Sequence, residues 1–225
     1  MSDLAICVIA LAPVALTTGV PSAAPLARRE WWLLVASLSL LYWLHAYIWH
    51  YPKAFSDRCA RAPLALLAPT PVKVFGRLEI VGKVQQITSL VLYWGVGATR
   101  RGFEGVADPA RVAHSLCGVA LIAAGQALNG AVYKAIGEAG VYYGFKLGET
   151  VPWCTGFPFS LGLRHPQYVG VALTLIGIAV AFAPDASFVA DGMLHAFLVW
   201  ASFYIVMSRM ESSGDNDSEP TKKGK

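Results

Sequence analysis

Residues 168–184, YVGVALTLIGIAVAFAP, and residues 191–208, DGMLHAFLVWASFYIVMS, are two apolar runs separated by a short polar stretch. Each run approaches or reaches the roughly 17 to 25 residues that an α-helix needs to cross a bilayer. Pro184 and Asp185 come between the runs, and this residue pair is typical of a turn. The pattern predicts two membrane-spanning helices joined as a tight hairpin.

The chain on either side of this hairpin is similarly apolar. Of the 225 residues, 56% are hydrophobic and 14% are charged, whereas a soluble domain carries roughly one quarter charged residues. The predicted fold class is therefore all-α, a polytopic integral membrane protein with about 5–6 transmembrane helices, and most soluble enzyme folds are excluded. The four other candidate segments are 4–20, 31–49, 79–98 and 112–131.

The segment 79–98 begins with polar residues that are costly in lipid. Glu79, Lys83, Gln85 and Gln86 fall within its first two turns. We expect these side chains to face other helices or the membrane interface.

The distribution of Lys and Arg predicts an orientation, because short basic loops stay on the cytoplasmic side. If all six segments cross from a cytoplasmic N-terminus, the loops around 50–78 and 132–167 and the C-terminal tail carry twelve basic residues, against five on the other side. Even if the segment 4–20 does not cross, the loop 132–167 and the tail share one side, because two membrane-spanning segments separate them.

Composition also limits the possible partners. The net charge of +4 is modest and the basic residues lie between apolar runs, so a nucleic-acid partner is not expected. The four cysteines are far apart, without a CxxC pair or a matching His spacing, so no metal site is expected. The sequence leaves the oligomeric state open.

The segment near 132–166 is predicted to be re-entrant or interfacial. Gly140, Gly144 and Gly148 recur every fourth residue, which on a helix makes a smooth stripe for close approach. Pro158 disfavours a helical conformation at Phe157, so the Gly-Phe-Pro-Phe run is an interfacial connector.

Arg164, His165 and Pro166 open the fifth segment. Proline suits the first turn of a helix, and free N–H groups and partial positive charge at that end favour an anion. With Arg164 and His165 beside it, this helix start is a candidate binding point for a carboxylate or phosphate. Lipid anchoring by Arg164 is an equally good interpretation of the residues alone.

Four ordered motifs within residues 112–213 together resemble the phospholipid N-methyltransferases of the endoplasmic reticulum, particularly the plant-type enzymes that methylate phosphatidyl-N-methylethanolamine toward phosphatidylcholine. They are Gly140-x-Tyr142-Tyr143-Gly144-x-x-x-Gly148, Val151-Pro152-Trp153, Phe157-Pro158-Phe159 and His165-Pro166-Gln167-Tyr168-Val169-Gly170. Isoprenylcysteine carboxyl methyltransferases share the Arg-His-Pro-x-Tyr-x-Gly pattern.

The resemblance implies S-adenosylmethionine-dependent methylation of a membrane phospholipid. It places a methyltransferase core with the cofactor and lipid site at 112–211, after N-terminal transmembrane segments (1–111). Residues 212–225 are rich in Ser, Gly and Asp and almost free of apolar residues, so a disordered cytosolic tail is expected there. The tail ends in Lys222-Lys223-Gly224-Lys225, which resembles a dilysine retrieval signal and favours the endoplasmic reticulum membrane; a solvated basic tail is the alternative. Acceptance of phosphatidylethanolamine itself stays open.

The implied cofactor site combines a Gly-x-Gly element with an acidic pair. The first element falls on Ala123-Ala124-Gly125, with alanine replacing its first glycine, and the pair falls on Glu211-Ser212, with one acid replaced by serine. The full set of implied cofactor-binding residues is Ala123, Ala124, Gly125, Arg164, His165, Glu211 and Ser212.

The implied chemistry needs a base, because a headgroup ammonium must lose a proton before its nitrogen can attack the donated methyl group. His165 and Glu211 are the candidate catalytic residues, with His165 preferred as base and Glu149 and Glu211 as alternatives. Aromatic faces can bind a methylated ammonium and a basic side chain can bind the lipid phosphate. The candidate substrate-binding residues are Tyr142, Tyr143, Lys146, Trp153, Tyr168, and additionally Phe157 and Arg164.

Two other functions fit part of the sequence. An isoprenylcysteine carboxyl methyltransferase would account for the Arg-His-Pro motif but not for Gly-x-Tyr-Tyr-Gly or Phe-Pro-Phe. A non-enzymatic membrane scaffold would account for the apolar segments but has no reason to keep Glu211 and the Arg164-His165 pair on the same side.

Overall fold

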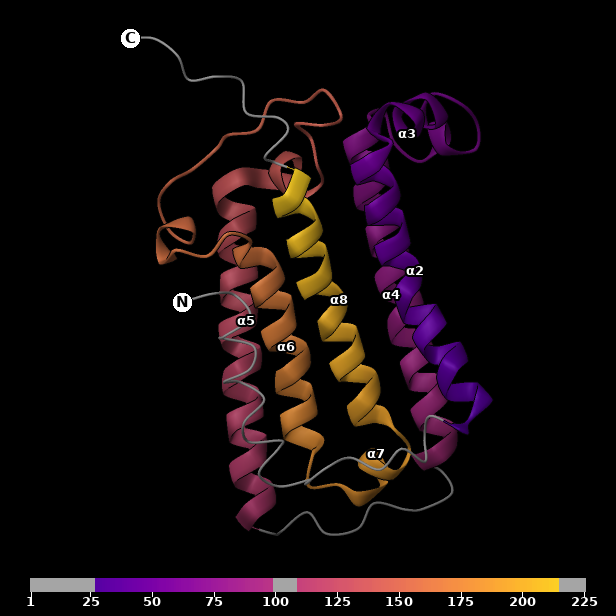
Figure 1. The fold of residues 1–225 in the computed structure, drawn as a ribbon, viewed down its shortest axis with the longest axis vertical. Helices are drawn as coiled ribbons and strands as arrows, with labels where there is room; N and C mark the ends of the chain where they lie inside the picture. The colour runs from indigo at the N-terminus through magenta and orange to yellow at the C-terminus, as the bar shows by residue number, and fades with distance from the viewer. Residues whose placement is uncertain (1–26, 99–108, 215–225) are drawn as a thin grey trace.

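A computed structural model describes residues 27–98 and 109–214, and every regular element in these ranges is helical (Figure 1). The all-α prediction is confirmed, while the first candidate segment, 4–20, lies outside the described residues. The helices are α2 (Arg29–His50), α3 (Pro52–Cys59), α4 (Pro71–Ala98), α5 (Pro109–Val141), α6 (Pro166–Phe182), α7 (Ala186–Ala190) and α8 (Met193–Gly214), with single 3-10 turns η2 (Leu64–Leu66) and η3 (Phe159–Leu161).

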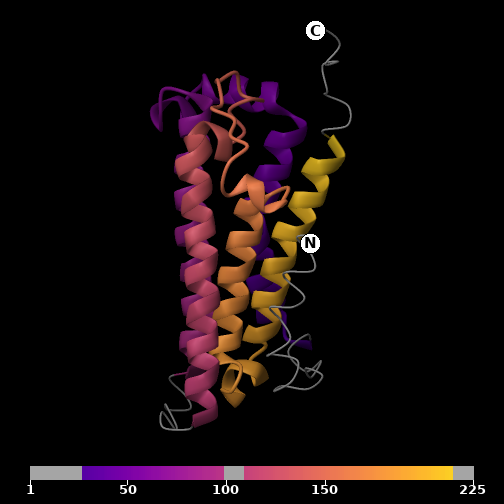
Figure 2. The same ribbon diagram turned by 90° about the vertical axis from the view of Figure 1, so that its left-hand side faces the viewer.

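Five long helices run up and down in a bundle, in the spatial order α5, α6, α8, α2, α4 (Figures 1 and 2). One end of the bundle, which we call the connector end, holds α3, the C-terminal end of α8 and residues 142–165, the connector. The opposite end holds α7 and the start of α2. The segment before α6 and the end of α8 thus lie at the same end of the bundle, as their predicted common side of the membrane requires.

Three of the helices are long and apolar enough to cross a membrane: α2, residues 111–141 of α5, and residues 193–212 of α8. Helix α6 is more apolar but shorter, with 17 residues, or about 26 Å at 1.5 Å per residue. The protein is therefore a helical membrane protein, and five of the six predicted segments form helices. How many of these helices cross the membrane remains a prediction.

The outer surface of the bundle is apolar, as a lipid-facing surface should be. Ile80, Val84 and Ile87 of α4 are more than half exposed, as are Leu116 and Val119 of α5. Two other side chains confirm that polar groups of α4 face inward, since Glu79 and Gln86 are buried.

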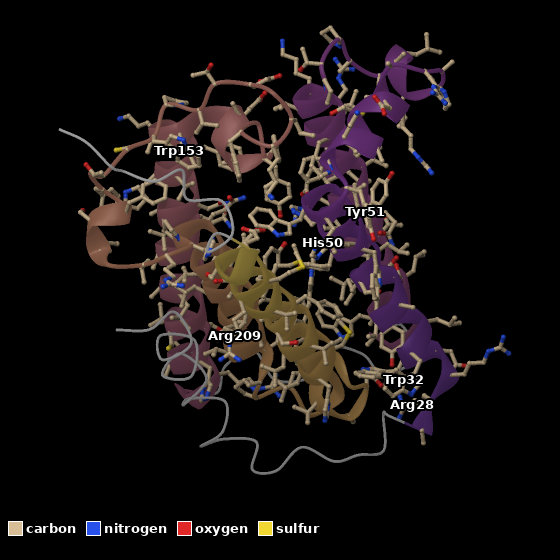
Figure 3. The ribbon with its side chains drawn as sticks, turned by 45° about the horizontal axis from the view of Figure 1, so that its top comes forward. Arg28, Trp32, His50, Tyr51, Trp153 and Arg209 are labelled. Atoms are coloured by element: carbon tan, nitrogen blue, oxygen red, sulfur yellow. The ribbon has the colours of Figure 1, made fainter. Side chains whose placement is uncertain are left out.

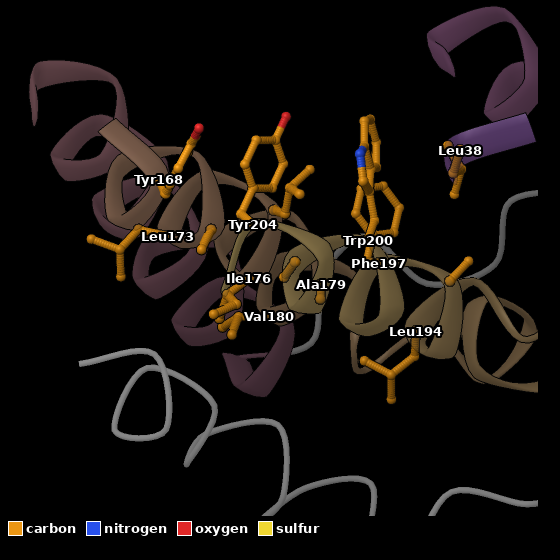
Figure 4. Close-up of a cluster of buried hydrophobic side chains, with 14 of the residues drawn as sticks. Leu38, Tyr168, Leu173, Ile176, Ala179, Val180, Leu194, Phe197, Trp200 and Tyr204 are labelled. Atoms are coloured by element: carbon orange, nitrogen blue, oxygen red, sulfur yellow. The ribbon is translucent and has the colours of Figure 1, made fainter. Parts of the chain in front are cut away.

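The main core lies between α6, α8 and α2 (Figure 4). Ile176, Ala179 and Val180 of α6 meet Leu194 and three buried aromatic side chains of α8, all at 9% exposure or less. Small residues on α6 allow α8 to pack closely, which is how helices associate where lipid is as apolar as the side chains. The predicted hairpin is confirmed, with the short helix α7 inside its turn.

Helices α5 and α6 touch backbone to backbone at two glycine pairs. A Cβ placed on Gly125 would lie 2.4 Å from the Gly170 carbonyl oxygen, and one on Gly118 would lie 2.5 Å from the Gly177 oxygen. Both distances are too short for any side chain, so the glycines set the separation of the two helices.

Several predicted boundaries were wrong. Helix α5 continues to Val141, ten residues beyond the predicted segment end, through a backbone break at Gly137 (φ 64°). The three spaced glycines therefore do not form a helical stripe: Gly144 lies in the turn after α5 and Gly148 has φ 84°. Helix α8 reaches Gly214, so residues 212–214 are helical rather than disordered; residues 215–225 lie outside the described ranges.

The glycine contact gives a matched stability test. Gly125→Ala should destabilise the protein by about 1–3 kcal/mol because its methyl group must push α6 away. Gly130→Ala, in the same helix but with no atom near its added Cβ, should be neutral or stabilise by up to about 1 kcal/mol. Thermal unfolding in detergent measures both, and equal stability of the two variants would contradict the backbone contact.

Candidate active site

A cavity of about 360 Å³ opens at the connector end. Its walls come from the last turns of α5, the connector, the start of α6 and the end of α8, with Trp49 from α2. Of the predicted site residues, the cavity is lined by Tyr143, Trp153, Arg164, His165, Tyr168 and Glu211.

Glu211 lies at the centre of this arrangement. Its side chain is buried, although it comes from the last turn of a helix. Glu211 Oε1 accepts hydrogen bonds from the hydroxyl groups of Tyr143 and Tyr168, which are 3.1 Å apart. Because a buried carboxylate is costly without partners, these bonds explain how it is tolerated.

His165 is the N-cap residue of α6, and Pro166 follows at the first helical position as predicted. Its Nδ1 lies 3.6 Å from Glu211 Oε2, and its Nε2 is 2.9 Å from the Ser212 hydroxyl. The imidazole also stacks on the Tyr168 ring, at 5.6 Å between centroids. These contacts bring together predicted residues from α6 and α8 that are 46 or more positions apart in the sequence.

Tyr143 reaches Glu211 through an unusual backbone conformation. Helix α5 ends with the Gly144 N–H bonded to the Ala139 carbonyl, and Tyr143 takes the left-handed conformation (φ 56°) that glycine usually adopts at helix ends. That conformation costs an L-residue about 1–2 kcal/mol. Its result is that the phenol is buried against Glu211 instead of facing solvent.

The charged and aromatic residues around the cavity differ in exposure. Arg164 is exposed at its edge, and Trp153, at the connector end away from Arg28 and Trp32, is 66% exposed (Figure 3). The Lys146 ammonium lies 3.8 Å from the centre of the Trp49 ring, which lines the cavity. Lys146 is therefore adjacent to the cavity without lining it.

The remaining predicted site residues lie elsewhere. Ala123 and Ala124 are exposed on α5 and Gly125 packs on α6, at least seven residues, or about 10 Å of helix, before the cavity-lining Val132. Tyr142 points away from the cavity, toward Phe75 of α4 and the hydroxyl of Tyr133 at 2.8 Å. None of these four residues lines the cavity, so their location does not support the binding roles predicted for them.

Sequence reasoning missed two contributions from α2. No sequence motif assigned Trp49 to the site, yet its ring forms part of the cavity wall. His45 was not considered, yet its Nδ1 is 3.0 Å from the Tyr143 hydroxyl. A histidine within an apolar run was the available signal, because ionisable residues inside membrane helices are often functional.

The chemistry of the cavity fits a zwitterionic ligand that also carries a second positive charge. Arg164 can pair with a carboxylate, Glu211 with an ammonium, and aromatic faces with a further cation. Among the described residues no cluster of three or more His, Cys, Asp or Glu side chains has the geometry of a metal site.

The fold and the cavity define a helical membrane protein with a carboxylate, an imidazole and a guanidinium at one end of the helix bundle. Residues 113–213 match the phospholipid methyltransferase family model. The matched stretch runs from α5 to the last turn of α8.

A curated relative is phosphatidyl-N-methylethanolamine N-methyltransferase of Arabidopsis thaliana, 39% identical over 95 residues. The aligned part makes up 42% of this chain and 51% of the relative, so the chain spans about half of that protein's length. No solved structure matches the chain significantly.

The buried Tyr143 phenol should stay protonated well beyond the usual range. Burial raises the pKa of Tyr143, and the Glu211 carboxylate beside it raises that pKa further. Since the hydrogen bond to Glu211 needs the protonated phenol, it should persist at a pH where an ordinary tyrosine, with a pKa of about 10, is ionised. Ultraviolet titration should show equal numbers of phenolates at that pH in the wild type and Tyr143→Phe. One additional phenolate in the wild type would show that Tyr143 ionises normally.

Proposed function

We propose that this protein transfers methyl groups from S-adenosylmethionine to the amine of phosphatidyl-N-methylethanolamine and its dimethyl product, toward phosphatidylcholine. The family match and the name of the Arabidopsis relative support this substrate class. The observation that carries the proposal is the meeting of Glu211, His165 and Arg164 at one cavity, from α8 and the start of α6.

The residues of this cavity suit the proposed methyl donor. Arg164 would bind its carboxylate and Glu211 its ammonium through charge-assisted hydrogen bonds. When bound, S-adenosylmethionine supplies an electrophilic methyl group on a sulfonium. The aromatic side chains that line the cavity would face that positive charge, while Tyr143 and Tyr168 keep Glu211 in place.

The headgroup amine has to lose a proton before it can react. An alkylammonium has a pKa near that of lysine, about 10.4, and a low-dielectric cavity holding another cation disfavours its charged form. His165 would accept the proton, because its imidazole lines the cavity and Ser212 and Glu211 orient it. Glu149 does not line the cavity, so its position does not favour the alternative of Glu149 as base.

The headgroup would be recognised by aromatic rings and a guanidinium. The position of Lys146 shows that the face of Trp49 accepts an ammonium, and such contacts contribute roughly 0.5 to 2 kcal/mol each. Phe145 and Trp153 stand next to each other near the mouth, 5.6 Å between ring centres. Arg164 at the exposed edge is placed to pair with the lipid phosphate or with the carboxylate of the methyl donor.

The exposed aromatic side chains of the connector support delivery of the substrate from the membrane. Phe145, Trp153 and Phe157 are each more than 40% exposed, and aromatic residues gather at membrane interfaces. The connector would therefore rest at the headgroup level, next to the acceptor lipid. By the charge distribution this is the cytosolic leaflet, and we propose the endoplasmic reticulum as the membrane.

Removal of either central group should abolish or strongly reduce methyl transfer. We expect His165→Ala and Glu211→Ala to lower turnover at least about 100-fold, the range found for general acid–base residues. Both variants should still be recovered in the membrane fraction. Transfer of labelled methyl groups into lipid measures the effect, with Glu149→Ala as a control that should stay within about threefold of the wild type. Wild-type turnover in either cavity variant would remove that residue from the site.

The lipid product identifies the substrate. Membranes from a host without phosphatidylcholine synthesis, expressing this chain and given labelled S-adenosylmethionine, should accumulate label in phosphatidylcholine when phosphatidyl-N-methylethanolamine is supplied. Labelling of a prenylated cysteine peptide and no lipid would instead indicate a carboxyl methyltransferase. Absence of label from both would contradict the proposed activity.

A further inference from the structure

Polar side chains link the cavity to the N-terminal helices through the interior of the bundle. Glu79 of α4 contacts His45 Nε2, and His45 Nδ1 lies 3.0 Å from the Tyr143 hydroxyl. Tyr143 in turn bonds to Glu211. The four groups therefore form one continuous chain from α4 through α2 and the connector to α8.

The direction of each hydrogen bond in this chain follows from which groups can donate. The Tyr143 hydroxyl has one proton, which it donates to the Glu211 carboxylate. Its oxygen must then accept from His45, so Nδ1 of His45 carries a proton. A second proton lies between His45 Nε2 and the Glu79 carboxylate. On whichever of the two atoms it rests, this hydrogen bond fixes the imidazole ring with Nδ1–H directed at Tyr143.

Burial makes this chain a firm constraint. The side chains of His45 and Glu79 are 13% and 10% exposed, and Tyr143 and Glu211 are buried. Away from water the groups have few alternative partners, and hydrogen bonds there are stronger and polarise one another. The His45 ring also forms T-shaped contacts with the Phe75 and Tyr143 rings, at 4.8 and 5.5 Å between centroids.

Both His45 and Glu79 lie outside residues 113–213, the stretch that matches the family. Trp49, one turn after His45 on α2, lines the cavity. The N-terminal helices thus contribute both a wall and an internal support to a site whose other residues come from the C-terminal half.

We infer that His45 and Glu79 are positioning residues for the methyl donor. They hold the Tyr143 hydroxyl so that it fixes Glu211 Oε1, which leaves Oε2 on the side of His165, 3.6 Å from its Nδ1. This inference rests on the proposed function, in which Glu211 binds the ammonium of S-adenosylmethionine. It assigns the N-terminal helices a part in donor affinity.

Equilibrium binding of tritiated S-adenosylmethionine to the purified full chain in detergent tests this role. Glu79→Gln keeps the size of the side chain but removes its charge, and His45→Gln can still donate but lacks the ring that fixes the direction. We expect each to raise the Kd for S-adenosylmethionine about tenfold. In the presence of Tyr143→Phe, which breaks the chain, adding Glu79→Gln should change the Kd less than twofold.

Ser89→Ala is the matched control. Ser89 of α4 bonds to Ser37 of α2 at 2.7 Å, in the same helix pair but without contact to Tyr143. Its Kd should stay within twofold of the wild type. In active preparations, the KM for the lipid should not change in Glu79→Gln, whereas the KM for S-adenosylmethionine should rise. A merely structural defect would affect both and would lower the unfolding temperature of the variant.

The possible outcomes separate the inference from the proposed function. If the wild type binds no S-adenosylmethionine, the proposed function fails and the inference with it. If the wild type binds it but Glu79→Gln and His45→Gln bind equally well, the inference alone is wrong. Multiplicative effects of Glu79→Gln and Tyr143→Phe would also overturn it, because the residues would then act separately.

Discussion

The arrangement of this protein depends on one buried carboxylate at the end of its last helix. Glu211 lies where α8 meets the connector and α6, and it stays buried because two tyrosine hydroxyl groups bond to the same oxygen. An unpaired carboxylate there would be too costly to retain. The groups that satisfy it also place His165 at the cavity, so the burial of a charge and the geometry of the site have one cause.

The helix packing supplies the rigid frame for this interaction. Glycine pairs hold α5 against α6 at backbone contact, and small side chains of α6 admit the aromatic side chains of α8. Since the start of α6 is thereby fixed relative to α5 and α8, His165 and Tyr168 have little freedom to move away from Glu211. Close packing remote from the cavity is therefore part of what orients it.

The N-terminal helices extend this frame. Helix α2 packs on α8 and brings His45 and Trp49 to the connector end, while α4 places Glu79 behind His45. Polar residues inside these helices are expensive in lipid, and their pairing across α2 and α4 offsets that cost. The contact between His45 and Tyr143 then links this pair to the C-terminal half of the chain.

The sequence by itself determined the class of fold and the part of the site that lies in continuous motifs. Long apolar runs require helices in a membrane, Pro166 marked the start of α6, and the basic residues placed the connector and the end of α8 together. Local patterns could not show that Tyr143 leaves the helix in a left-handed conformation or that Tyr142 beside it points to α4. They also could not show that Gly125 packs against the backbone of α6. Only the tertiary structure decided these, because each depends on what residues from distant helices place next to the side chain. The membrane environment acts on every residue of a helix alike, whereas a site depends on a few contacts between particular atoms.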